Sequence, residues 1–202
     1  MKRDHLCLAV LANLVLALLL SACEKNVSPS PPGGAYYPTG KGSRWAYMTN
    51  NGSAFTTVAL GDTLLNDTTY ATLGTENSSP FRAVRYQNGR YYQRYNVYGV
   101  FGEEHVFLRD DLPVGGTWTN EGATGGEVYT VVARDAKRTV NGREYTNTLE
   151  VQMGRYHNVN GQPTLVPMYR SIYARGVGEV ASLVDSPYGP ILLRDYQVEP
   201  SK

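Results

Sequence analysis

The sequence predicts an all-β protein: an antiparallel, hairpin-rich meander in which two pseudo-symmetric repeats form one sandwich or barrel-like domain. Three observations lead to this expectation. Beyond residue 38 the chain is rich in Thr, Val, Tyr and Gly, and no long segment places apolar residues at the three-and-four spacing of a helix. The dipeptide Asn-Gly, which suits tight hairpin turns, occurs four times. Finally, a set of landmarks recurs in the same order in both halves.

The first 22 residues have the plan of an export signal. Lys2 and Arg3 precede an almost unbroken apolar run from Leu6 to Leu20. With 15 residues this run is short for a membrane-spanning helix, which needs about 20. We therefore expect residues 1–22 to be a lipoprotein signal peptide that is removed from the mature protein.

The stretch LSAC, which ends at Cys23, resembles the bacterial lipobox, in which the cysteine becomes the lipidated first residue of the mature chain. Lipidation also explains a lone cysteine outside the cytoplasm; a secreted protein with an incidental cysteine is the alternative. More than one acyl chain gives lasting attachment to a bilayer. The resemblance implies a lipid-anchored protein of the cell envelope. Because Glu24 rather than aspartate follows the cysteine, the outer membrane facing the periplasm is favoured in a diderm cell.

The segment EKNVSPSPPGGAYYP, after Cys23, is poor in aliphatic residues and rich in Ser, Pro and Gly. We interpret residues 23–38 as the lipidated N-terminus and a tether with a reach of roughly 20 Å. Cys7 leaves with the signal peptide and Cys23 is acylated, so no disulfide is expected and the domain depends on packing.

Alternation in the segment NTLEVQM predicts a half-buried strand. Leu149, Val151 and Met153 fall on one face, which we expect to be buried, whereas Glu150 and Gln152 fall on the exposed face. Hairpin turns are expected at the four Asn-Gly dipeptides, which begin at Asn51, Asn88, Asn141 and Asn160.

The recurring landmarks define the two repeats. GSRW ends at Trp45 and GGTW ends at Trp118, and each is followed 12 residues later by a Thr-Val pair. Both copies close on Leu-Arg-Asp. We expect a β domain over residues 39–198 that consists of repeats 39–112 and 113–198. Half a domain with open sheet edges is marginal alone, so pairing the halves would bury both apolar faces, with the tryptophans as packing anchors.

Tyr and Arg gather in RAVRYQNGRYYQRY, which spans residues 82–95. Folding about its Asn-Gly turn places Tyr86 opposite Tyr91, Arg85 opposite Tyr92, and Arg82 opposite Tyr95. We expect this hairpin to project from the sheet. Its pairs either stabilise an exposed ribbon or form a recognition surface, because Tyr and Arg are enriched at binding hot spots. The candidate binding residues are Tyr86, Tyr91, Tyr92, Arg94 and Tyr95.

Charge argues against nucleic acid as a partner. Removal of residues 1–22 leaves 17 basic and 17 acidic side chains, from 19 and 18 in the whole chain. A neutral balance without clustered Lys or Arg is not typical of a surface that binds nucleic acid or an anionic membrane.

No motif indicates catalysis. The chain lacks a Gly-x-Ser-x-Gly elbow, and the mature form has no free thiol. In EEHVFLRDD, the doublets Glu103-Glu104 and Asp110-Asp111 lie near His105, but their spacing is not that of a metal-binding loop. We therefore expect no catalytic residue, no metal and no cofactor. The doublets would act as an acid and base only if folding joined them.

Most of the mature chain resembles a family of uncharacterised bacterial envelope lipoproteins. The resemblance rests on YYPTGKGSRWAY, with its Tyr, Pro, Gly, Trp and Tyr, on LPVGGTW and NGREYTNTLEV, and on the late Gly-Val-Gly strand in YARGVGEV. It implies an envelope β protein and assigns no catalytic residue to this chain.

The expected function is a non-enzymatic binding or interaction module that docks another envelope protein. A carrier or chaperone that holds an apolar or amphipathic ligand, such as a lipid, in a β cavity is the alternative, and an envelope hydrolase is a remote one. Large residues expected on the inner faces favour a filled core, and hence docking; they include Trp45, Tyr47, Leu149, Val151 and Leu183.

Overall fold

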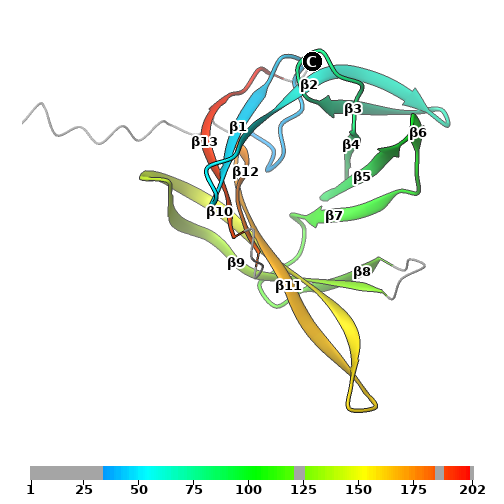
Figure 1. Cartoon of the computed structure of the whole chain (residues 1–202), viewed down its shortest axis with the longest axis vertical. Coiled ribbons are helices and arrows are strands. Elements are labelled where there is room, and N and C mark those ends of the chain that lie inside the picture. Colours follow the sequence, from blue (N-terminus) through cyan, green and yellow to red (C-terminus); the bar gives the residue numbers. More distant parts are fainter. Residues whose placement is uncertain (1–33, 121–125, 185–188, 201–202) are drawn as a thin grey trace, which may run out of the picture.

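The computed structural model describes residues 34–120, 126–184 and 189–200. These residues form 13 antiparallel strands in one sheet, which curls around a core (Figure 1). None of them is helical, and none forms a helix that could cross a membrane. The prediction of an all-β, antiparallel, hairpin-rich meander is confirmed.

Successive strands are joined mainly by short turns. The first half contains β1 (Arg44–Thr49), β2 (Ala54–Leu65), β3 (Thr68–Gly74), β4 (Arg82–Gln87), β5 (Arg90–Val97), β6 (Val100–Phe101) and β7 (His105–Arg109). The second half contains β8 (Thr117–Asn120), β9 (Glu127–Val140), β10 (Arg143–Val159), β11 (Gln162–Ala174), β12 (Gly178–Val184) and β13 (Ile191–Gln197).

Each expected repeat occupies one contiguous part of the sheet. The spatial order runs β6-β5-β4-β3-β2-β1-β13-β12-β11-β10-β9-β8, and β7 pairs with β5. The first and last strands of the domain, β1 and β13, therefore join the two parts. Of the arrangements left open by the sequence, the described residues form neither two packed sheets nor a barrel closed by backbone pairing, but one open sheet.

The Asn-Gly turns fix the register of the hairpins. Three of them, beginning at Asn88, Asn141 and Asn160, have positive φ at both turn residues, as a type I′ turn requires. At the fourth, only Gly52 has a positive φ, and the Asn51 side chain accepts hydrogen bonds around the turn instead. The β4–β5 register agrees with the prediction, since Tyr86 lies opposite Tyr91.

Side chains rather than a backbone ladder bridge the open seam between β7 and β8. The backbone N–H of Val106 donates to Asn120 Oδ1 at 3.2 Å, and the Val106 carbonyl accepts from Asn120 Nδ2 at 2.9 Å. The same carbonyl accepts from Trp118 Nε1 at 2.9 Å. Asn120 thus takes the place of a neighbouring strand's peptide group, which satisfies a sheet edge that would otherwise be open.

Both tryptophans are buried, as expected of packing anchors. Trp45 is 3% exposed and Trp118 is 8% exposed. Trp118 stacks on Tyr129 with ring centroids 5.1 Å apart, and Trp45 donates to the Val177 carbonyl. Leu183 was expected inside but is 39% exposed, because it falls on the outer face of β12.

The two faces of β10 differ from the prediction at one position. Leu149, Val151 and Met153 are buried, as expected. Glu150 was expected to be exposed, yet only 3% of it is accessible, because Arg138 and Arg170 of the neighbouring strands cover it with ion pairs.

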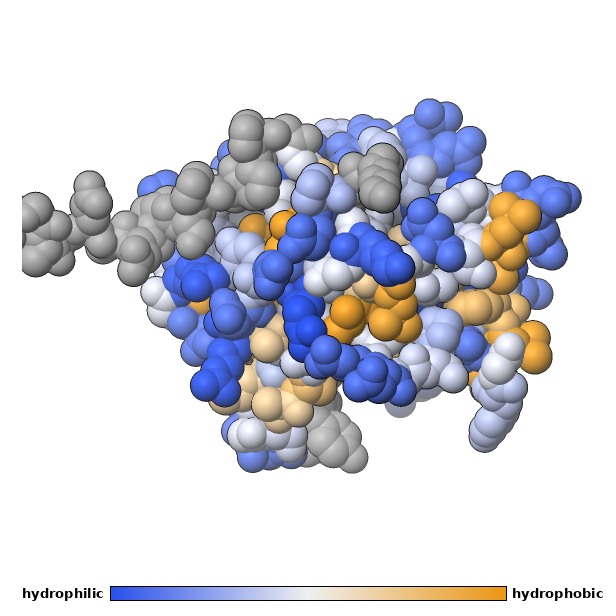
Figure 2. Space-filling view, turned by 90° about the horizontal axis from the view of Figure 1, so that it is seen from above, coloured by the Kyte–Doolittle hydropathy of each residue, from blue (hydrophilic) through white to orange (hydrophobic). Residues whose placement is uncertain are grey.

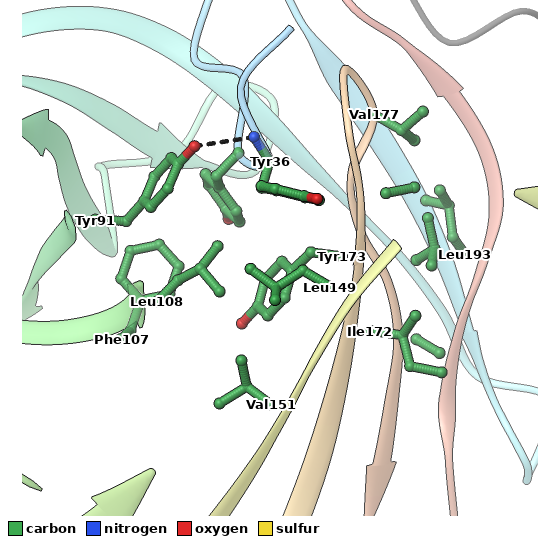
Figure 3. Packing of buried hydrophobic residues seen from close by; sticks show 14 of the residues in the cluster. Tyr36, Tyr91, Phe107, Leu108, Leu149, Val151, Ile172, Tyr173, Val177 and Leu193 are labelled. Atoms are coloured by element: carbon green, nitrogen blue, oxygen red, sulfur yellow. Dashed lines mark hydrogen bonds between the residues drawn. The ribbon is translucent and has the colours of Figure 1, made fainter. Parts of the chain in front are cut away.

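The segment just before residue 38 lies in the core and is not part of a tether. Tyr36 and Tyr37, which were assigned to the tether, are 0% and 7% exposed. The Tyr36 N–H donates to the Tyr91 hydroxyl at 2.9 Å (Figure 3), and the Tyr37 ring packs edge-on against Phe107. The boundary at residue 38 is corrected, since burying two tyrosine rings stabilises this segment in the fold.

The β4–β5 hairpin does not project, contrary to expectation, because it is flanked by β3 and β7. The β10–β11 hairpin projects instead (Figure 1). Its residues 156–168 pair only with each other, since β9 ends its pairing at Arg155 and β12 begins its pairing at Tyr169. Elsewhere, the face seen in Figure 2 is largely polar, with apolar residues in small separate groups.

Candidate functional site

The interior of the curled sheet contains a hollow that side chains do not fill. It measures about 250 Å³ and adjoins a second hollow of about 190 Å³. Arg82, Glu179 and Ser182 line both. The first hollow is otherwise walled by Gln93, Ser171, Val151, Phe107 and four tyrosines, and the second by Tyr37, Tyr47, Phe55, Thr57, Phe81 and Ile191. The large side chains expected on the inner faces therefore leave part of the interior open.

Arg82, at the start of β4, is a cation that no carboxylate of the described residues pairs with. Its guanidinium carbon lies 5.0 Å from the Tyr37 ring centroid and 5.6 Å from that of Phe107. Its Nη1 donates to Gln93 Oε1 at 3.3 Å, whereas its buried Nε has no hydrogen-bond partner. Within the described ranges, Arg82 forms no ion pair. Aromatic faces partly compensate such a charge but do not neutralise it.

Glu179, on β12, is the anion of the same hollow. Its Oε1 accepts a hydrogen bond from the Ser171 hydroxyl at 2.7 Å. Burial raises the pKa of Glu179, although this hydrogen bond and the charge of Arg82 oppose the shift. In the part of the chain that the structure describes, Glu179 makes no ion pair.

Aromatic side chains form the walls around these two charges. Tyr173 and Phe107 point into the interior in Figure 3, and the Tyr37 ring packs against both. Tyr47 stacks on Phe55 with centroids 5.2 Å apart and donates its hydroxyl to the Glu179 carbonyl at 3.1 Å. Burial raises the pKa of Tyr47 and Tyr173, so both phenols stay neutral.

Three of the five predicted binding residues lie on the inner face of the β4–β5 hairpin. Tyr95, 49% exposed, lies opposite Arg82 and lines the first hollow. Tyr91 is only 1% exposed, and its hydroxyl donates to Asp110 Oδ2 at 3.1 Å. Tyr86 is 56% exposed and packs beside Tyr91.

The other two predicted residues, Tyr92 and Arg94, lie on the outer face. There Arg85 forms an ion pair with Glu104 at 2.7 Å and lies over the Tyr92 ring. Arg94 Nε donates to the Tyr70 hydroxyl, which in turn donates to Glu104. Burial opposes ionisation of Glu104, but hydrogen bonds from Arg85 and Tyr70 outweigh it and lower the pKa. The five residues thus do not form one surface.

The other polar residues considered in the sequence lie apart from the hollows. Glu104 belongs to the outer network, Asp111 pairs with Arg109 at 2.6 Å, and neither His105 nor His157 lines a hollow. Among the described residues, no group of three or more His, Cys, Asp or Glu could hold a metal ion. The lipidation candidate Cys23 and the signal peptide lie outside the described residues.

Sequence reasoning found Arg82 and Tyr95 as an opposed pair but missed Glu179. The signal was weak, since Glu179 stands alone in the segment GVGEV and its partners come from strands distant in sequence. Comparison with protein-family models, with curated proteins and with solved structures finds no match to this chain.

Proposed function

We propose that this protein is a lipid-anchored lipoprotein of the bacterial cell envelope that binds a small amphipathic ligand inside its curled sheet. In this proposal residues 1–22 are the signal peptide, Cys23 carries the lipid, and the outer membrane facing the periplasm is the site of attachment. No catalytic residue, metal or cofactor takes part.

The observation that carries the proposal is the pair of adjoining hollows. Both have aromatic walls and both contain Arg82 and Glu179, and the first also contains the polar side chains of Gln93 and Ser171. Small-molecule sites are concave, with apolar walls and a few polar groups that fix orientation. An amphipathic ligand matches this combination of charges and aromatic walls, because its polar end meets the charges and its apolar end meets the rings.

The hydrogen bonds favour binding over catalysis. The Ser171 hydroxyl donates to Glu179, and the two histidines of the β domain lie outside the hollows. A serine nucleophile needs a base within hydrogen-bond reach that is itself oriented by a third group. Among the described residues, Ser171 is the only side chain that hydrogen-bonds to the Glu179 carboxylate, so no third group orients this base.

Native mass spectrometry of protein purified gently from an expressing bacterium tests the proposal. We expect a small molecule to be retained by the wild type and lost from Ser182→Trp, because Ser182 lines both hollows and a bulky ring there would obstruct the space between them. The matched control is Leu183→Trp, whose side chain lies on the outer face of the same strand and is already 39% exposed. Equal retention by both variants would place the ligand elsewhere and contradict the proposal.

Docking of another envelope protein is a second candidate, favoured by the projecting ribbon of residues 156–168. A two-stranded ribbon is marginally stable in water, and this one exposes Tyr156, Val159 and Leu165 by 41% to 55%. A photo-crosslinking residue at position 165 should capture a specific envelope protein in cells, whereas one at Leu64, which is 65% exposed on β2, should not. Identical crosslinking from both positions would contradict docking at the ribbon.

A further inference from the structure

The chemical class of the ligand follows from the charges in the hollows, and it rests on the function proposed above. Arg82 carries a fixed positive charge, and its Nε is buried without a partner. A buried polar group without a hydrogen bond is costly, and a charge more so. An anionic oxygen of the ligand would satisfy this N–H and the charge together, as arginine does with carboxylates and phosphates.

Glu179 requires a positively charged group on the ligand, just as Arg82 requires a negatively charged one. It faces the same hollows, and although the charge of Arg82 acts on it, the two residues form no ion pair in the described part of the chain. A ligand with only a negative charge would meet Arg82 but would be repelled by Glu179. A ligand with only a positive charge would meet Glu179 but would be repelled by Arg82. Among these simple cases, a ligand carrying both charges is attracted to both residues.

The second hollow requires an apolar group next to these charges. Tyr47 and Phe55 stack there, and Phe55 and Phe81 are still 42% and 39% exposed. An apolar group placed on them would cover this aromatic surface. The two volumes, about 250 and 190 Å³, are each below the roughly 300 to 1,000 Å³ of drug-sized sites, so the bound part of the ligand is small.

We propose that the ligand is a small zwitterion with an apolar group. Its anionic oxygens bind Arg82, its ammonium group binds Glu179, and its apolar group lies against Tyr47 and Phe55. Two sources share this chemistry: an α-amino acid or short peptide with an apolar side chain, and the head group of a phosphoethanolamine lipid.

Isothermal titration calorimetry of the full-length protein in detergent tests this assignment with matched probes. Phenylalanine carries both charges, 3-phenylpropionate lacks the ammonium group, and phenethylamine lacks the carboxylate. We expect phenylalanine to bind about tenfold or more tightly than either analogue, because each charged hydrogen bond contributes about 1.5 to 3 kcal/mol. Glycerophosphoethanolamine tests the second source, and the tighter of the two zwitterions identifies it.

Substitutions assign each charge to its partner. Arg82→Gln should weaken phenylalanine about tenfold and leave phenethylamine unweakened, whereas Glu179→Gln should weaken both but not 3-phenylpropionate. The matched controls are Arg90→Gln and Glu103→Gln, which change exposed residues outside both hollows. Circular dichroism spectra that coincide with the wild-type spectrum confirm that each variant is folded.

The possible results separate this inference from the proposed function. If 3-phenylpropionate or phenethylamine binds as tightly as phenylalanine in the wild type, the zwitterion assignment is wrong, while an amphipathic ligand in the hollows stands. If no probe binds and no small molecule is retained in native mass spectrometry, both proposals fall. The wild-type comparison needs no variant, so it decides even if a substitution prevents folding.

Discussion

Replacement of Trp118 by alanine should strongly destabilise the domain, because Trp118 has two roles at the seam. Its ring is 8% exposed and stacks on Tyr129 at 9° between planes, and its indole N–H donates to the Val106 carbonyl at 2.9 Å. Removing a buried tryptophan costs about 3 to 5 kcal/mol of unfolding free energy. At about 2 to 4 °C per kcal/mol for a domain of this size, the melting temperature should fall by roughly 6 to 20 °C.

Conservative variants separate packing from hydrogen bonding. Trp118→Phe keeps an aromatic ring but loses the indole donor and part of the ring volume, and Val106 still accepts from Asn120. We expect a loss of about 1 to 2 kcal/mol. Asn120→Ala leaves the Val106 N–H without its acceptor and should cost about 1 to 3 kcal/mol. The double variant removes both donors to one carbonyl, so its loss should exceed the sum of the two.

Urea unfolding followed by far-ultraviolet circular dichroism measures these changes without relying on tryptophan fluorescence. The control is Val114→Ala, which alters a 58% exposed residue in the connection before β8 and should change stability by less than about 0.5 kcal/mol. A loss below about 1 kcal/mol for Trp118→Ala, or strictly additive effects in the double variant, would refute the role assigned to the seam.

Three further predictions concern other parts of the chain. Cys23→Ser should abolish incorporation of radiolabelled palmitate, and continued incorporation would exclude lipidation at this residue. Glu179→Gln should raise the melting temperature at pH 7 but not below about pH 4. Because the pKa of Glu179 is raised in the folded state, the folded state loses stability as the pH rises above the unfolded value of 4.5, and glutamine removes this loss. A difference in melting temperature that does not depend on pH would contradict this reasoning. Gly178→Ala should cost about 1 to 3 kcal/mol in urea unfolding, because φ is +114° and the new Cβ would lie 3.1 Å from Trp45 Nε1, and an unchanged midpoint would show that this backbone is unstrained.

Local signals predicted the strands and hairpins well because a tight turn fixes its own neighbours. The turn at Asn88 sets every pair between β4 and β5, so the face shared by Arg82, Tyr91 and Tyr95 could be derived from sequence alone. Nothing within that segment shows which side of the hairpin faces the core or which strands flank it. The hairpin was therefore wrongly expected to project, although its internal register was correct.

Features that depend on distant strands were not predictable. Glu150 is buried because Arg138 and Arg170 cover it, and alternation along β10 cannot reveal side chains of neighbouring strands. The candidate site could not be predicted for the same reason, since Arg82 and Glu179 lie on strands from different halves of the sheet. The burial of Tyr36 and Tyr37 was not predicted for another reason. Their segment is poor in aliphatic residues and therefore has the composition of a tether, but its two aromatic rings are enough to anchor it in the core.

The pairing of β1 with β13 means that a circular permutation would turn this fold into a simpler meander. The ends of the domain already touch, since the Glu199 N–H donates to Ser43 Oγ at 2.9 Å. A gene that links these ends and begins at β8 would encode strands in nearly their spatial order, with its new termini at the seam. Such a chain pairs most strands with the one made just before, whereas in the natural order β1 cannot pair with β13 until this last strand has been made.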